Sequence, residues 1–542
     1  MRPAPSLSAS AGGLTVTAHG GSLVAAAQDV LAGADGLPAS LVAKDPTLWG
    51  PDAATEAGVR LGWLDAVATG RDLLPDLLAL RGELAAEGVD RVVLCGMGGS
   101  SLAPEVVCAT AGRPLVVVDT TDPGQVRAAL VELERTVVVV SSKSGGTLET
   151  DSHRRAARAA FEAAGIDPAR RVVVVTDPGS PFEQAAQDEG SRAVFLADPD
   201  VGGRYSALTA FGLVPAGLAG VDVAALLDQA AALQPSLVEA DSPALLLGAL
   251  LAGGAVGGRD KLIVAATGGG GFGDWAEQLV AESTGKQGQG LLPVVVEAVD
   301  APGTEPAADS HLLLVGGSGG VGDGGVETPH TSVTGPLGAQ FLAWEFATAV
   351  AGWSLRINPF DQPNVQESKD NTAAVLAGGP VPQTPAVLVE GGVEVHATGD
   401  LLTGVGDVAG ALAALLAAVP ERGYLAVMAY LDRHADATAH DLRALLARRV
   451  AHPVTFGWAP RFLHSTGQFH KGGPQTGAFL QITGAVQEDL EVPGRPFTFG
   501  ELQAAQAVGD LRALHERGRP VLRLHLLDRA EGLATVLRAA AG

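Results

Sequence analysis

Short apolar strands that alternate with helices constrain the fold of this chain more than any other feature. From Arg91 onward, apolar runs of four to six residues are separated by helical segments such as residues 148–164. Strands and helices of these lengths predict βαβ units around a parallel sheet. The predicted strands of this first unit are 91–95, 115–119, 136–141, 171–176 and 193–196.

The same alternation returns further along the chain. A strand at 260–266 leads through a turn at 267–273 into a helix from Asp274, which is expected to cap it. Strands are then predicted at 292–297 and 311–315, a mobile Gly-rich loop at 316–325, and an apolar helix at 337–351. In the C-terminal part, Gly391-Gly392 indicates a hairpin, and strands are predicted at 424–431 and 522–527.

The chain has 542 residues, too many for one hydrophobic core, so several domains are expected. Leucines at helical spacing between residues 72 and 88 favour a helical lead-in. The expected division is a helical N-terminal segment (1–88), two parallel-sheet α/β domains (89–235 and 236–380) and a C-terminal α/β region (381–542).

Charge and composition exclude several classes of protein. The net charge of −24 argues against a nucleic-acid partner, which would require a basic surface. Two cysteines, Cys95 and Cys108, form no disulfide framework and favour a cytoplasmic location. The longest apolar stretches, 244–258 and 408–419, fall short of the roughly 20 residues of a membrane span. The N-terminus lacks the apolar core of a secretion signal, so neither membrane insertion nor secretion is expected.

Two Gly-rich loops follow predicted strands and precede predicted helices. Residues 92–106 read VVLCGMGGSSLAPEV, a geometry that aims backbone N–H groups at an anion. The same loop nearly matches a dinucleotide fingerprint, with Asp119 placed as a ribose-binding acid, although Ser101 replaces the third glycine. A phosphate loop, a dinucleotide loop and a structural turn remain open for this segment.

The second loop, residues 141–150, reads SSKSGGTLET. Its hydroxyl groups, its glycines and Lys143 suit a phosphate monoester, and the alternative is a Ser/Thr-rich helix cap. A dinucleotide enzyme has no evident use for this second loop, which favours phosphate binding at both.

Three further segments carry groups suited to acid–base chemistry. In residues 274–290, Gln278 and Glu282 share one helix face, four residues apart. Residues 358–370, NPFDQPNVQESKD, form a rigid turn into a helix that carries Lys369. Residues 461–473, RFLHSTGQFHKGG, hold His464 and His470 in a polar loop, and no carboxylate or cysteine accompanies them there, so no metal site is expected.

Taken together, these segments resemble the phosphoglucose isomerase family, which is built from two sugar-isomerase (SIS) domains. Five motifs between Val92 and Asn371 occur in the family's order, including GGRYSALTAFGL at 202–213 and AESTGK at 281–286. The C-terminal part resembles the isomerase portion of transaldolase–isomerase fusions. The resemblance implies two doubly wound, three-layer αβα domains.

The resemblance also implies roles for individual residues. Glu282 maps to the family's proton-transferring base, Arg204 lies near the reacting carbons and Lys369 contacts substrate. The expected substrate and phosphate ligands are Gly99, Ser100, Ser142, Lys143, Ser144, Thr147 and Gln278. The family's ring-opening histidine has no clear counterpart, since His311 and His330 lie in unsuitable contexts, so His464 or His470 is expected to serve.

The function that the resemblance implies is reversible isomerisation of glucose-6-phosphate and fructose-6-phosphate through a cis-enediol, in glycolysis and gluconeogenesis. This chemistry requires no metal or organic cofactor. The expected partner is the sugar-phosphate substrate, and the chain is expected to be a monomer or homodimer. A dual phosphoglucose/phosphomannose isomerase and a non-catalytic sugar-phosphate-binding SIS protein are the alternatives.

Overall fold

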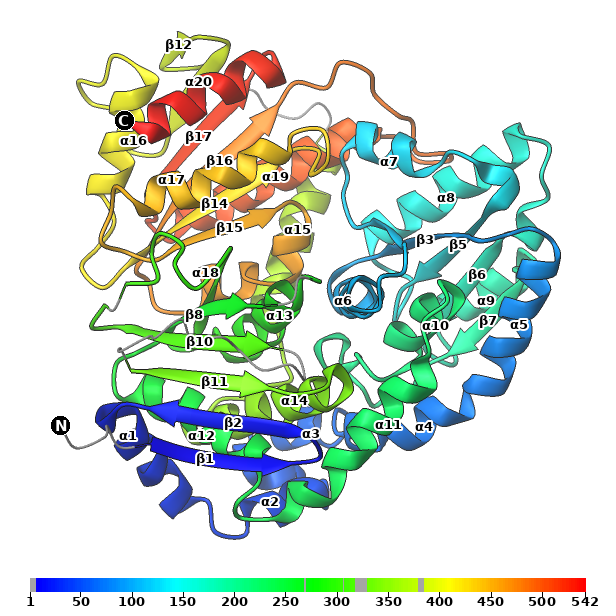
Figure 1. Ribbon diagram of the computed structural model, residues 1–542. Coiled ribbons are helices and arrows are strands. Elements are labelled where there is room, and N and C mark those ends of the chain that lie inside the picture. The colour runs from blue at the N-terminus through cyan, green and yellow to red at the C-terminus, as the bar shows by residue number, and fades with distance from the viewer. Residues whose placement is uncertain (1–5, 268–269, 306, 317–328, 379–384) are drawn as a thin grey trace.

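Three sheets surround the centre of the molecule in the computed structural model (Figure 1). The structure describes residues 6–267, 270–305, 307–316, 329–378 and 385–542, so the predicted loop at 316–325 lies outside it apart from Gly316. The mixed α/β architecture with parallel sheets confirms the predicted fold class.

The first sheet is entirely parallel, with the strand order β4-β3-β5-β6-β7. Alternate residues of each central strand enter two different cores: Leu94 and Val139 face α5, α6 and α10, whereas Val93 and Val138 face α7, α8 and α9. Helices therefore cover both faces, as in a doubly wound sheet. The strands are β3 (Arg91–Gly96), β4 (Val116–Val118), β5 (Thr136–Ser141), β6 (Val172–Thr176) and β7 (Ala193–Leu196).

The second sheet has the order β1-β2-β11-β10-β8-β9. Its strands β8 (Lys261–Ala266), β9 (Leu292–Val296), β10 (Ser310–Gly316) and β11 (His330–Thr334) are parallel. The hairpin β1 (Ser6–Ala11) and β2 (Leu14–His19) adds to it through antiparallel pairing of β2 with β11. The prediction of a helical N-terminal segment is therefore wrong for residues 6–19. Leu14, Val16 and Ala18 all face the core, which fixes the strand register.

The third sheet, in the C-terminal region, has the order β12-β13-β17-β16-β14-β15. Its parallel strands are β14 (Tyr424–Tyr430), β15 (Val454–Trp458), β16 (Gly477–Gly484) and β17 (Val521–Leu526). The predicted hairpin at Gly391-Gly392 is confirmed as β12 (Leu388–Glu390) and β13 (Val393–Ala397). One face of this sheet shares a core with β8, β9 and β10, so the proposed boundary at residue 381 separates two closely packed parts.

The helices run as follows: α1 (Gly21–Gly33), α2 (Leu37–Val42), α3 (Ala54–Ala57), α4 (Ala66–Asp72), α5 (Leu74–Ala86), α6 (Leu102–Thr110), α7 (Pro123–Ala129), α8 (Leu148–Ala163), α9 (Pro181–Asp188), α10 (Ala210–Leu218), α11 (Val223–Leu233), α12 (Pro243–Val256), α13 (Phe272–Thr284), α14 (Leu337–Leu355), α15 (Pro363–Ala377), α16 (Val408–Ala417), α17 (Asp441–Ala447), α18 (Gly467–Gly472), α19 (Phe499–Glu516) and α20 (Arg529–Ala541). Helix α13 begins at Phe272, so Asp274 lies in its first turn and is not the cap that we expected.

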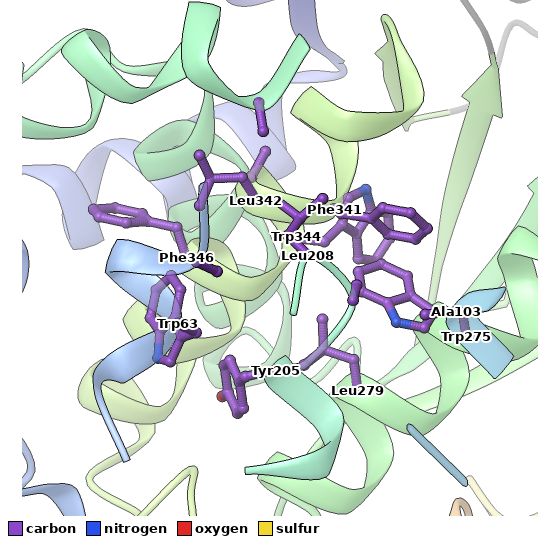
Figure 2. Close-up of a cluster of buried hydrophobic side chains, with 14 of the residues drawn as sticks. Trp63, Ala103, Tyr205, Leu208, Trp275, Leu279, Phe341, Leu342, Trp344 and Phe346 are labelled. Atoms are coloured by element: carbon purple, nitrogen blue, oxygen red, sulfur yellow. The ribbon is translucent and has the colours of Figure 1, made fainter. Parts of the chain in front are cut away.

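Large aromatic side chains support the helix that carries Gln278 and Glu282. Trp275 of α13 packs edge-on against Phe341 of α14, with ring centroids 4.6 Å apart. Figure 2 shows this cluster extending to Tyr205 and Trp63. Aromatic contacts of this kind contribute beyond their buried area and hold α13 firmly in place.

No single helix in the described part of the chain is long and apolar enough to cross a membrane. Two consecutive helical segments, 223–238 and 243–256, are together long and apolar enough by length and composition alone, but they meet at a bend of 71°.

Candidate active site

A cavity of about 440 Å³ lies where the first sheet, α15 and the C-terminal region meet. Its size suits a small ligand. The lining comes from the loop after β5, the start of α8, one side of α15, the residues after β15, and α19. The residues are Ser144, Gly146, Leu148, Glu149, Val365, Gln366, Ser368, Lys369, Asp370, Thr372, Ala373, Leu463, His464 and Gln506.

The loop after β5 presents its outer part to this cavity. Ser144 and Gly146 are exposed and line it, and Thr147 is the N-cap of the 16-residue helix α8. The positive end of that helix therefore faces the ligand space. Ser142 is buried, and its hydroxyl oxygen accepts a hydrogen bond from the Gly145 N–H group.

Lys143 lies apart from the cavity lining. Its Nζ atom is 2.5 Å from Asp177 Oδ2 and donates to the Pro199 carbonyl oxygen. Lys369, on α15, is the exposed cation that lines the cavity. Its role as a substrate contact, and that of Lys143 as a phosphate ligand, remain predictions.

A buried carboxylate and His464 form a hydrogen-bonded pair on the cavity wall. Glu149 Oε1 accepts a hydrogen bond from Gln506 Nε2 at 2.7 Å and pairs with His464 Nε2 at 3.1 Å. Burial alone would raise the pKa of Glu149, but the hydrogen bond and charge of His464, with Lys369 nearby, hold it at about 2. Glu149 is therefore ionised, and it fixes the orientation of the imidazole ring.

Gln278 joins this pair to Glu282. Its Nε2 atom donates to the His464 carbonyl oxygen at 2.7 Å and to Glu282 Oε2 at 3.2 Å. Glu282 lies behind the cavity wall and is only 3% exposed. Burial raises the pKa of its carboxyl group above the ordinary value, although Arg204 and His464 oppose the shift. A carboxylate with a raised pKa is suited to take and return a proton near neutral pH.

Arg204 connects Glu282 to the turn that precedes α15. Its Nε atom lies 3.7 Å from Glu282 Oε2, and its terminal nitrogens donate to the carbonyl oxygens of Pro359, Phe360 and Asp361. Arg204 is buried, so its fixed charge acts at short range on whatever lies beside Glu282. The sequence motifs at 202–213 and 358–370 thus meet in one cluster.

The first Gly-rich loop packs against the segment that carries Arg204. A Cβ atom on Gly99 would lie 1.9 Å from the Gly203 carbonyl oxygen, so this position admits only glycine. Ser100 follows Gly99 in the short helix Gly98–Ser100. The dinucleotide alternative fails here, because Asp119 is 2% exposed and its Oδ2 atom lies 2.7 Å from Arg461 Nε. A carboxylate held in this way is not free to bind a ribose.

We expect Gly99→Ala to destabilise the protein by about 1–3 kcal/mol, because the added methyl group must push apart two backbone segments. The displacement also moves Arg204, so both the melting temperature and catalytic turnover should fall. The matched control is Gly82→Ala, on the surface of α5 with no atom within 4 Å of the added Cβ. Equal melting temperatures for the two variants would contradict the close contact.

The structure separates the two candidate histidines. His464 lies on the cavity wall, whereas His470 is buried in the core that contains Tyr424 and Phe479. The Nδ1 atom of His470 is 3.0 Å from the Tyr424 hydroxyl oxygen. The placement of His470 at the site is therefore wrong: α18 turns its ring away from the cavity and into the core.

Two residues of the site were not predictable from their sequence context. Glu149 lies in a recognised motif, but an acid in the first turn of a helix is ordinarily explained by the helix dipole. Gln506 carries no motif at all, and only the packing of α19 against α8 brings it to Glu149. Among the described residues, no group of three or more His, Cys, Asp or Glu side chains is arranged to hold a metal ion.

Comparison with known proteins identifies the family. The family model described as phosphoglucose isomerase matches residues 80–251. A glucose-6-phosphate isomerase from Synechococcus sp. (strain JA-3-3Ab) is 31% identical over 365 residues, which cover 54% of this chain and 68% of that protein. This chain belongs to the phosphoglucose isomerase family.

Other members of the family match shorter parts of the chain. The glucose-6-phosphate isomerase of Thermosynechococcus vestitus is 30% identical over 53% of this chain and 66% of its own length. That of Geobacter sp. (strain M21) is 35% identical over 41% of this chain and 45% of its own length. The chain thus spans about half to two thirds of the length of these relatives.

Solved structures share the fold of this family member. A glucose-6-phosphate isomerase from Chlamydia trachomatis has a TM-score of 0.53 at 20% identity, covering 68% of this chain and 89% of that one. A hypothetical protein from Thermus thermophilus has a TM-score of 0.55 at 24% identity, covering 66% of this chain and 98% of that one. At these identities the likeness concerns the fold alone.

Proposed function

We propose that this protein is a glucose-6-phosphate isomerase that interconverts glucose-6-phosphate and fructose-6-phosphate. The observation that carries the proposal is the buried Glu282, whose pKa is raised and which lies beside the fixed charge of Arg204. The Gln278 side chain separates Glu282 from the cavity, which is lined by a phosphate-type loop. Family membership supports the same activity.

The phosphate group would lie at the N-terminus of α8, near Ser144, Gly146 and the ammonium group of Lys369. From there the carbon chain of the sugar would extend along His464 toward Gln278 and Glu282. Binding energy from the phosphate then holds the reacting carbons against the base.

Glu282 would take the proton from C2 of the open aldose and return it to C1. The intermediate is a cis-enediolate, whose negative oxygen requires a nearby positive charge. Arg204 fits this role because its guanidinium group is always charged and is already held in place by the backbone carbonyls of residues 359–361. No step of this mechanism calls for a metal or organic cofactor.

Ring opening would be the task of His464. Glu149 holds Nε2 of the imidazole, which leaves Nδ1 to move a proton at the ring oxygen of the sugar. Because His464 belongs to the same chain as Glu282, we infer that the site is complete in a monomer. The enzyme would act in glycolysis and gluconeogenesis in the cytoplasm, where buried, unpaired Cys95 and Cys108 remain reduced.

The activity is tested by following fructose-6-phosphate conversion in an assay coupled to glucose-6-phosphate dehydrogenase and NADP⁺, with and without EDTA. We expect turnover that EDTA leaves unchanged. Binding of fructose-6-phosphate without turnover would favour the non-catalytic alternative. A parallel assay with mannose-6-phosphate tests the dual-specificity alternative, which predicts comparable rates.

Removal of the Gln278 amide should change the pH dependence of catalysis. Its N–H group stabilises the charged form of Glu282, so Gln278→Met should raise the pKa of the base further. Since the base must be ionised, the acid limb of kcat/KM should move to higher pH, by roughly one unit. The measurement is the pH profile with fructose-6-phosphate, and an unmoved acid limb in an active variant would contradict the contact.

A further inference from the structure

The C-terminal region contains a second cavity, of about 390 Å³, that the isomerase site does not use. It lies at the carboxyl ends of the parallel strands β14, β16 and β17, beside the start of α19. Its lining residues are Tyr430, Thr483, Gly484, Ala485, Val486, Asp489, Gly500, Glu501, Gln503, Ala504, Ala507, Arg523 and His525.

The position of this cavity is typical of a ligand site. Strands β14 and β16 are neighbours, but the chain leaves them in opposite directions: after β14 it crosses to β15 on one side, and after β16 it crosses to β17 on the other. Open α/β sheets bind ligands where two such connections diverge, beyond the carboxyl ends of the strands. Tyr430 and Gly484 end these two strands and line the cavity.

The side chains along this face of the sheet change character toward the cavity. At the amino end of the strands the face is apolar, with Tyr424, Phe479 and Val521 in the shared core. At the carboxyl end Arg523 and His525 replace the apolar residues on β17, although Leu522, Leu524 and Leu526 keep the opposite face apolar. A sheet face covered by α19 would ordinarily be apolar along its whole length.

Arg523 has no carboxylate partner in the part of the chain that the structure describes. Its Nε atom donates to Thr483 Oγ1 at 3.3 Å, and no acidic oxygen of the described residues lies within 4.0 Å of its guanidinium group. Burial lowers the pKa of Arg523, the expected effect of desolvating a cation. Arg523 is partly buried, and the negative charge of Glu394 on the adjacent strand β13 opposes this pKa shift without forming an ion pair with it. The terminal nitrogens of its guanidinium group therefore remain available as donors to a ligand.

Two further donors in the cavity also lack partners. The Tyr430 hydroxyl group and Gln503 Nε2 are buried without a hydrogen bond among the described residues. Burial raises the pKa of Tyr430 well above its usual value, so its hydroxyl group stays protonated and can donate. Unsatisfied buried donors of this kind are rare in folded proteins.

The acids at the cavity rim are already engaged elsewhere. Asp489 accepts hydrogen bonds from Gly500 N and from the Thr498 hydroxyl group, and Glu501 Oε2 accepts one from Thr498 N. These bonds cap α19 and engage both carboxylates at the start of that helix.

We propose that this cavity binds a small oxyanion, either a phosphate or a carboxylate, at a second site in the C-terminal region. The guanidinium group of Arg523 would bind two oxygen atoms of the anion, and the Tyr430 hydroxyl and Gln503 amide would donate to the others. The site is distinct from the cavity at His464, and the proposal does not depend on isomerase activity.

Calorimetric titration of the full chain with inorganic phosphate, and separately with malonate, tests the proposal. Arg523→Gln removes the cation without touching α19, whose Gln506 contacts Glu149 in the isomerase site. We expect Arg523→Gln to bind one of the two anions at least tenfold more weakly than the unchanged protein does. The anion whose binding is weakened shows whether the site takes a phosphate or a carboxylate. Arg71→Gln, at an exposed ion pair, is the matched control and should bind as the unchanged protein does.

For phosphate, which is also expected to bind near α8, the unchanged protein should take up two ions and Arg523→Gln one. Should Arg523→Gln fail to fold, Arg523→Lys replaces it, because it keeps the charge and loses two-point binding; several-fold weaker binding is then expected. Equal binding of both anions by the Arg523 variant and the unchanged protein, or no event beyond the isomerase site, would overturn the proposal.

Discussion

Replacement of Glu282 by glutamine is expected to lower kcat by a factor of about 10²–10⁴ and to leave sugar-phosphate binding nearly unchanged. Glutamine keeps the shape of the side chain and its contact with Gln278, but it cannot accept a proton. General-base catalysis contributes rate factors of this size. The measurement is kcat for fructose-6-phosphate, with binding of 6-phosphogluconate measured by calorimetry.

Glu277→Gln is the matched control on the same helix. Burial raises the pKa of Glu277 well above the usual value, with Asp274 adding to the shift, so its carboxyl group already resembles the neutral amide. We therefore expect near-normal turnover from this variant. Turnover by Glu282→Gln within tenfold of the unchanged protein would rule out Glu282 as the base.

Replacement of His464 by alanine is expected to lower kcat for glucose-6-phosphate by about 10²-fold or more, because the closed sugar ring must open before Glu282 can act. A substrate that cannot close a ring separates this role from a structural one. Erythrose 4-phosphate is such a substrate, and its isomerisation by His464→Ala should fall far less than that of glucose-6-phosphate. The ratio of the two rates is the quantity to measure.

His470→Asn serves as the control for this experiment. It disturbs the buried contact with Tyr424 and should lower the melting temperature, but the ratio of the two rates should stay normal. Equal losses on both substrates in His464→Ala would mean that the histidine positions the site and does not open the ring.

The central strands were predictable because each is a short run of β-branched residues between turn residues. Strand β5 occupies Thr136–Ser141, as the sequence indicates. The hairpin at residues 6–19 was not foreseen: its strands are rich in Ser, Thr and Ala, and the strand β11 that pairs with β2 lies some 300 residues away. Long-range pairing of this kind depends on the assembled sheet and leaves only a weak local pattern.

The site divides in the same way. Glu282, Gln278 and Arg204 follow from motifs, and the structure places all three in contact. The contribution of the C-terminal region could not be predicted in full. The composition of the loop does not indicate whether His464 or His470 lies at the site. Gln506 reaches Glu149 only because α19 packs against the first domain.

The central claim, proton transfer by a carboxylate through an enediol, is tested most directly by NMR of the sugar phosphates at equilibrium in D₂O. Because the proton held by Glu282 exchanges with solvent between turnovers, deuterium should appear at C2 of glucose-6-phosphate and at C1 of fructose-6-phosphate. Full isomerisation with both carbons still carrying only protium after many turnovers would contradict the account and indicate a direct hydride shift.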